Sequence, residues 1–155
     1  MFKPELVFIS NALSQEEVFK EISIILKNKG LVTENFLDNI MEREKNYPTG
    51  INMEVVNPTI PNIAIPHTET QYVKDCAIVP VKLNNTITFC NMINPNEQID
   101  VSYLFMILNN DPHNQANMLA SIMDFMVNTN PTELSSFFEE TDSKKIYAFL
   151  TKTFK

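Results

Sequence analysis

The sequence predicts an α/β protein with a mixed sheet of about five strands flanked by helices. Segments whose apolar residues recur at helical spacing alternate with short apolar runs of strand length, and clusters of proline, glycine or asparagine separate them. At 155 residues the chain is long enough to bury a substantial core. No repeat, low-complexity tract or linker divides it, so we expect a single domain over residues 1–155.

The first third of the chain predicts an extended arm and two helices. Residues 2–9 favour a strand or an extended arm. A capping-box pattern, Ser-Gln-Glu-Glu, opens a helix over about 14–29, and Gly30 is typical of a helix end. A second helix is expected to begin after Thr33 and to end before an Asn-Tyr-Pro-Thr-Gly segment. We expect Gly50 in that segment to meet a backbone requirement.

The middle of the chain predicts the strands of the sheet. The apolar run 63–65 is long enough for a short buried strand, and Pro66 stops it. Residues 76–81 and 86–89 are rich in strand formers, so we expect them to pair as a hairpin. The run 101–108 is apolar on both faces apart from one serine. We therefore expect it to be the central strand, covered on both sides.

The last third of the chain predicts three helices. Asp111 and Pro112 form a typical helix start, with an aspartate cap before a proline in the first helical position. The apolar face that follows extends to about Asn128. A short helix is expected over 130–138, and another begins at Ser143.

Composition and charge exclude several classes of function. The net charge is −7 and the basic residues are scattered, which argues against binding to nucleic acid. Cys76 and Cys90 have neither zinc-site nor disulfide-framework spacing, so we expect free thiols, no metal and no cofactor. The longest apolar stretch, 103–108, is too short to cross a bilayer, and the sequence shows no secretory signal. We expect a cytoplasmic protein that does not insert into a membrane.

Three side chains are candidates for one site. His67 follows the strand that Pro66 stops, and strand ends are where α/β proteins place functional groups. Arg43 is the only arginine among twelve basic residues, and its planar fork of donors suits a phosphate. His113 lies in the first turn of the helix predicted after the central strand, where free amides attract anions. Each residue also has an interpretation without function. His67 could be a histidine in a turn, Arg43 could form a surface ion pair, and His113 could be a solvated residue at a helix start.

An imidazole nucleophile with an arginine points to phosphoryl transfer through a phosphohistidine. The sequence has no G-x-S-x-G elbow and no H-E-x-x-H motif, and its two glycines cannot form a phosphate-binding glycine loop. No second type of chemistry competes with this interpretation.

A longer motif pattern comprises Arg43-Glu44, Tyr47-Pro48-Thr49-Gly50-Ile51 and Ile63-Ala64-Ile65-Pro66-His67-Thr68. This pattern resembles the enzyme IIA domain of the bacterial sugar phosphotransferase system, of the fructose–mannitol superfamily, over roughly residues 5–150. Three further motifs look most like the galactitol-specific branch: Phe89-x-x-Met92, Ile99-Asp100-Val101 and Asp111-Pro112-His113-x-Gln115.

The resemblance implies a mixed α/β sandwich that acts as a phosphotransferase. It implies that His67 accepts a phosphoryl group from phosphorylated HPr and passes it to a cysteine of the cognate enzyme IIB, which serves a IIC permease. Arg43 matches the family's arginine that supports the phosphoryl group. Mannitol-like members carry a second active-site histidine after the long strand, and this position falls on His113 or on Gln115.

The sugar and the cellular role stay open at this point. Galactitol is the nearest branch, but an enzyme IIA does not contact the sugar. The alternative function is a regulatory module whose phosphorylation state is read by a protein partner, and its sequence around His67 would look the same. A cognate enzyme IIB that can take the phosphate distinguishes the two functions.

Overall fold

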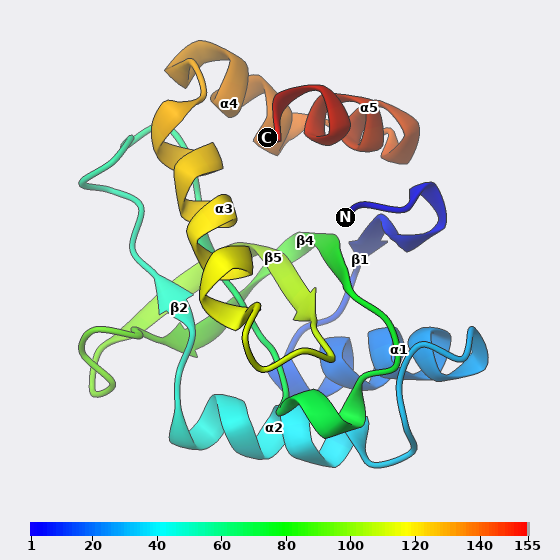
Figure 1. Cartoon of the computed structure of the whole chain (residues 1–155). Coiled ribbons are helices and arrows are strands. Elements are labelled where there is room, and N and C mark those ends of the chain that lie inside the picture. The colour runs from blue at the N-terminus through cyan, green and yellow to red at the C-terminus, as the bar shows by residue number, and fades with distance from the viewer. Residues whose placement is uncertain (155) are drawn as a thin grey trace.

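The computed structural model describes residues 1–154 and contains a five-stranded mixed sheet with helices on both faces (Figure 1). The strands are β1 (Phe8–Ser10), β2 (Gly50–Ile51), β3 (Asn62–Ala64), β4 (Ala77–Cys90) and β5 (Gln98–Leu108). They lie in the order β1-β4-β5-β3-β2. β1 is parallel to β4 and β3 is parallel to β5, while the other two pairs are antiparallel. The predicted α/β class is confirmed.

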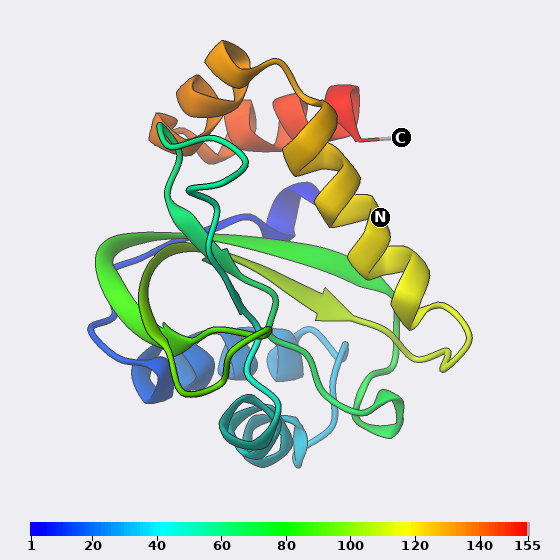
Figure 2. The ribbon, with the colours of Figure 1, turned by 90° about the vertical axis from the view of Figure 1, so that its left-hand side faces the viewer.

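Two layers of helices cover the sheet (Figure 2). The helices are α1 (Gln15–Asn28), α2 (Phe36–Asn46), α3 (Gln115–Asn128), α4 (Pro131–Glu139) and α5 (Ser143–Thr153), with short 3-10 turns η1 (Pro4–Leu6) and η2 (Thr70–Tyr72). α1 and α2 bury one apolar cluster against the sheet, and α3, α4 and α5 bury a second cluster on the opposite face. Among residues 1–154, none of the helices has the length and apolar character that crossing a bilayer requires.

β5 is the central strand, as the sequence predicts, and its side chains enter both apolar clusters. Val101 and Tyr103 belong to opposite clusters, although residues two apart share a face in a regular strand. The reason is a β-bulge. The adjacent residues Asn62 and Ile63 of β3 pair with Val101 and Tyr103 of β5, so Ser102 is an extra residue in β5. The one polar residue in the apolar run therefore marks the irregular position.

Local capping signals in the sequence agree with the structure of α1. The Ser14 hydroxyl accepts a hydrogen bond from the amide of Glu17 at 3.1 Å, and the Glu17 carboxylate accepts one from the amide of Leu13 at 2.8 Å. Gly30 follows the helix with φ +74°, a left-handed conformation that glycine adopts without strain. The predicted helix over about 14–29 is confirmed.

The predicted hairpin between 76–81 and 86–89 is wrong. β4 is one continuous strand, and both halves pair with β5 instead of with each other. The chain bulges within β4 without reversing, and the side chains of Asn84 and Asn85 donate hydrogen bonds to Asn11. Because the long apolar β5 offers a buried partner to both halves, tertiary pairing outweighs the local turn signal.

The helix start predicted at Asp111 and Pro112 is wrong by about one turn. α3 begins at Gln115, with Asn114 as its N-cap residue. Asp111 instead closes a separate turn, because its carboxylate accepts a hydrogen bond from the His113 amide and its carbonyl accepts one from the Asn114 amide, both at 3.0 Å. His113 consequently lies before the helix and not within its first turn.

Three chain segments meet at one edge of the sheet. Because β3 and β5 are parallel, their C-terminal ends lie at the same edge. The pairing continues past β3, where the Pro66 carbonyl accepts a hydrogen bond from Ile107 at 3.0 Å and His67 forms a bridge with Ile107. α2 leads into β2, whose first residue Gly50 pairs with Ala64 at the end of β3. The segments after β3, after β5 and after α2 are thereby brought together.

Candidate functional site

A cavity of about 350 Å³ lies where these segments meet. It contains two of the three predicted site residues, His67 and Arg43, and also Gln115, but not His113. Its lining consists of Arg43, His67, Thr68, Glu69, Thr70, Gln71, Pro112 and Gln115. A larger cavity of about 480 Å³, between the far end of α3, the start of α4 and the end of α5, is lined by no histidine or arginine. We therefore take the smaller cavity as the candidate site.

Nδ1 of the His67 ring faces a backbone carbonyl, and within residues 1–154 the other ring nitrogen, Nε2, makes no hydrogen bond. Its Nδ1 lies 2.8 Å from the carbonyl oxygen of Ile65. A carbonyl can only accept a hydrogen bond, so Nδ1 carries the hydrogen and Nε2 holds the lone pair. Burial lowers the pKa of His67 below its ordinary 6.5, and the positive charge of Arg43 lowers it further. At neutral pH the side chain is an uncharged imidazole with Nε2 available as a nucleophile.

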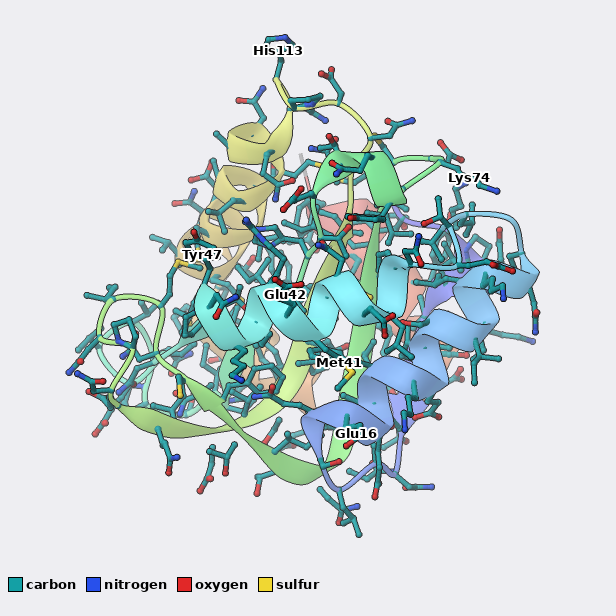
Figure 3. All side chains as sticks on the ribbon, turned by 90° about the horizontal axis from the view of Figure 1, so that it is seen from below. Glu16, Met41, Glu42, Tyr47, Lys74 and His113 are labelled. Atoms are coloured by element: carbon teal, nitrogen blue, oxygen red, sulfur yellow. The ribbon has the colours of Figure 1, made fainter. Side chains whose placement is uncertain are left out.

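Arg43 lies near the C-terminus of α2, beside the ring of Tyr47. Its guanidinium carbon is 4.6 Å from the centre of the Tyr47 ring, one helical turn further on. Tyr47 lies at the C-terminal end of α2 (Figure 3). Within residues 1–154, the buried Nε of Arg43 has no hydrogen-bond partner. A buried donor without a partner is costly, so this position favours an acceptor that arrives with a ligand.

Gln115, the first residue of α3, is oriented by Asn109. The Asn109 amide nitrogen donates to the Gln115 side-chain oxygen at 3.0 Å and to the carbonyl of Asp111 at 2.8 Å. The Asn109 side-chain oxygen accepts a hydrogen bond from the Asp111 amide at 3.0 Å. Because the Asn109 group that faces Gln115 is the amide nitrogen, a donor, the Gln115 atom next to it must be the side-chain oxygen. Its Nε2 is buried and has no partner in the part of the chain described by the structure.

His113 lies outside this arrangement. It is exposed, and it projects away from α2 and from the body of the protein (Figure 3). Of the two positions that the sequence leaves open, the structure places Gln115 in the cavity lining and His113 away from it. The one-turn shift of the helix start accounts for this, because it places Gln115 rather than His113 in the first helical position.

Glu44 and Thr49 form a buried polar pair; both belong to the sequence motif, but their pairing was not predicted from the sequence. The Glu44 carboxylate accepts hydrogen bonds from the Thr49 hydroxyl at 2.6 Å and from the Thr49 amide at 2.7 Å. Only 5% of Glu44 is exposed, and burial raises the pKa of its carboxyl to about 7 although the Thr49 hydrogen bonds oppose the rise. Helical spacing would have revealed this burial, since Phe36, Ile40 and Glu44 follow one another at intervals of four.

The arrangement can bind an oxyanion next to a nucleophile. A guanidinium and a primary amide supply N–H donors, and an uncharged imidazole supplies an attacking nitrogen. The α3 N-terminus adds a positive electrostatic field, and its N-cap residue Asn114 makes no side-chain cap hydrogen bond. Within residues 1–154, no three His, Cys, Asp or Glu side chains are grouped as metal ligands.

Comparison with known proteins supports the same chemistry. Residues 1–153 match the family model described as the phosphoenolpyruvate-dependent sugar phosphotransferase system, EIIA 2. The chain is 25% identical over 144 residues to the galactitol-specific EIIA component of Escherichia coli (strain K12), covering 91% of this chain and 92% of the relative.

Two solved structures from Escherichia coli share the fold. The crystal structure of the mannitol IIA superposes with a TM-score of 0.73 at 16% identity, covering 97% of this chain and 99% of the other. The complex of enzyme IIAMTL with phosphorylated enzyme IIBMTL gives a TM-score of 0.71 at 17% identity, covering 98% of both chains.

Proposed function

Because this chain belongs to the EIIA 2 family of the phosphoenolpyruvate-dependent sugar phosphotransferase system, we propose that His67 is the residue it phosphorylates. Components of this family are phosphotransferases with a phosphohistidine intermediate that work with a cognate EIIB. The chain is therefore a phosphocarrier component of a sugar phosphotransferase system. The identity of its histidine, its donor and its sugar are the parts that we propose.

The first step of the proposed reaction is attack by Nε2 of His67 on the phosphorus of phosphorylated HPr. A nitrogen–phosphorus bond forms at Nε2, and the donor's bond to phosphorus breaks, with its electron pair returning to the donor. The Nδ1 hydrogen stays on the ring, where the Ile65 carbonyl, 2.8 Å away, stabilises the positive charge that develops.

In the second step, a cysteine thiolate of the cognate enzyme IIB attacks the same phosphorus. A sulfur–phosphorus bond forms, the bond to Nε2 breaks, and the electron pair returns to the imidazole. His67 ends in the tautomer in which it began, so the protein is ready for another cycle without a proton transfer.

The observation that carries this proposal is the pair of buried, unpartnered donors beside the nucleophile. Arg43 Nε and Gln115 Nε2 both lack partners within residues 1–154, and both residues line the cavity with His67. Phosphoryl transfer develops charge on the equatorial oxygens of phosphorus, and such donors offset it. We assign Arg43 as the charged support and Gln115, rather than His113, as a neutral donor.

A galactitol-type system, with phosphorylated HPr as donor and a IIC permease downstream, is the pathway that we propose for the phosphate. It is supported by the match to galactitol-specific EIIA components at 25% identity and by the motifs shared with that branch. A regulatory role would use the same histidine, so the acceptor and not the site distinguishes the two functions.

The experiment incubates the protein with phosphoenolpyruvate, enzyme I and HPr, and follows acid-labile phosphate on the chain. We expect labelling of the unmodified protein and of His113→Ala, and none of His67→Ala. Label that persists on His67→Ala would reject the site. Adding galactitol-type enzyme IIB should then discharge the phosphate onto its cysteine. Failure with this partner would reject the galactitol assignment, and failure with the enzyme IIB of every other sugar system tested would favour the regulatory role.

A further inference from the structure

We propose that Glu44 and Thr49 are positioning residues that hold the Ile65 carbonyl, and through it the reactive tautomer of His67. The role in transfer rests on the proposed function, in which His67 carries the phosphoryl group. The inference concerns a buried chain of hydrogen bonds that starts on α2 and ends at the His67 ring.

The first link joins α2 to the turn before β2. Both oxygens of the Glu44 carboxyl are used by one residue, since Oε1 accepts from the Thr49 hydroxyl at 2.6 Å and Oε2 from the Thr49 amide at 2.7 Å. Two bonds to one residue define the orientation of Thr49 as well as its distance. Thr49 is itself buried, with 4% exposed, so water cannot replace these bonds.

The second link joins Thr49 to the end of β3. The Ile65 amide donates to the Thr49 hydroxyl oxygen at 3.2 Å and also to the Thr49 carbonyl at 3.3 Å. On the other side of the same residue, the Ile65 carbonyl accepts from His67 Nδ1 at 2.8 Å. Thr49 thus secures the residue whose carbonyl selects the His67 tautomer.

Gly50 holds the backbone next to Thr49 rigidly in place. A Cβ on Gly50 would lie 2.6 Å from the Cys90 carbonyl oxygen, a distance that real side chains do not tolerate. The close approach lets the Gly50 carbonyl accept a hydrogen bond from Met92 at 2.8 Å. The residue next to Thr49 is therefore anchored to the end of β4, which explains why a glycine stands there.

This geometry links the helix that carries Arg43 to the strand end that carries His67. Arg43 and Glu44 are neighbours on α2, and the first lines the cavity while the second points into the protein. The hydrogen bonds from Glu44 to Thr49 and from Thr49 to Ile65 therefore set where the helix that carries Arg43 lies relative to the strand end that carries His67. Loss of these hydrogen bonds should change the tautomer of His67 and the alignment of Nε2 with a bound phosphoryl group.

The experiment measures the His67 tautomer by ¹⁵N NMR on the full-length protein and the rate of phosphoryl transfer from phosphorylated HPr. Thr49→Val removes the hydroxyl at nearly constant volume. It should raise the fraction of the Nε2–H tautomer and slow transfer about 10- to 100-fold. Thr49→Ser restores the hydroxyl and should return both readouts to near the values of the unmodified protein.

A matched control separates positioning from general stability. Thr129 is another buried threonine, at the far end of α3, whose hydroxyl donates to the Phe125 carbonyl. Thr129→Val should lower the melting temperature but leave the tautomer and the rate unchanged. If Thr49→Val fails to fold, Glu44→Gln provides the second variant, because it keeps the side-chain length and one acceptor; it should shift the tautomer in the same direction.

The outcomes are distinct. A folded Thr49→Val or Glu44→Gln protein with an unchanged tautomer and rate would overturn the positioning role. If the unmodified protein takes no phosphate, the proposed function fails, yet the NMR comparison still decides whether Glu44 and Thr49 hold the His67 ring.

Discussion

The guanidinium carbon of Arg43 lies 4.6 Å from the centre of the ring of Tyr47, the residue that caps the C-terminus of the same helix. The positive charge of Arg43 is thereby placed against an aromatic face beside the cavity. Arg43→Lys keeps the charge but loses the planar fork of donors. We expect it to slow transfer from phosphorylated HPr by about tenfold or more, measured by rapid-quench labelling. Wild-type rates in this variant would remove Arg43 from the site.

A pair of substitutions tests which residue after β5 acts on the phosphate. Gln115→Leu removes a donor to a charged group, which is worth about 1.5–3 kcal/mol, so transfer should slow by roughly ten- to a hundredfold. His113→Leu, two residues earlier and exposed, should leave the rate within about twofold. Slower transfer in His113→Leu than in Gln115→Leu would contradict the assignment of Gln115.

The pH dependence of transfer should follow the lowered pKa of His67. Burial and the charge of Arg43 depress this pKa below 6.5, so more than half of the side chain is uncharged at pH 6.5. Protonation at Nε2 removes the attacking lone pair, and the rate should fall only as pH drops below that value. Because the unfolded chain binds this proton more readily than the folded one, stability from this group is also lost as pH falls. An NMR titration midpoint for His67 above 6.5 would contradict this.

Glu44 should make stability depend on pH in the opposite direction. Its folded pKa is about 7 against an ordinary 4.5, so between these values the folded protein retains a proton that the unfolded chain has released. The free energy of unfolding should therefore decrease as pH rises from 4.5 to 8, by up to about 3 kcal/mol relative to Glu44→Gln. Urea titrations at several pH values measure this. Glu42→Gln, on the exposed side of α2, is the control, and a constant difference for Glu44→Gln would refute the expectation.

The hydroxyl of Tyr103 is buried in the apolar core. The residue is 1% exposed, and within residues 1–154 its oxygen makes no hydrogen bond. Burial raises the pKa of this phenol strongly, which reflects the same lack of solvation. Tyr103→Phe should stabilise the protein by about 1 kcal/mol, as measured by chemical denaturation. Tyr47→Phe, at an exposed ring, should change stability little; a destabilised Tyr103→Phe protein would show that the hydroxyl has a function.

Several elements could be predicted from the sequence because they depend on local chemistry. The start of α1 follows from Ser14 and Glu17, which bond to amides within four residues, and its end follows from Gly30. The position of His67 beyond β3 agrees with the Pro66 signal, because proline has no amide hydrogen to donate to a ladder, although its carbonyl still accepts a hydrogen bond from Ile107. Arg43 stood out as the only arginine. In each case the signal and the structure it produces lie within a few residues of each other.

Other features depend on partners far apart in the chain, and only the tertiary structure decided them. β4 is one strand because β5 pairs with both of its halves, which no turn signal within β4 could reveal. The orientation of Gln115 depends on Asn109, and Asn109 is itself oriented by the backbone of Asp111. A helix start one turn later placed Gln115 in the cavity lining and left His113 exposed. The sequence by itself thus pointed to His67 as the proposed nucleophile and to Arg43, whereas folding decided which donors lie around them, because a side chain's direction depends on every element that packs against it.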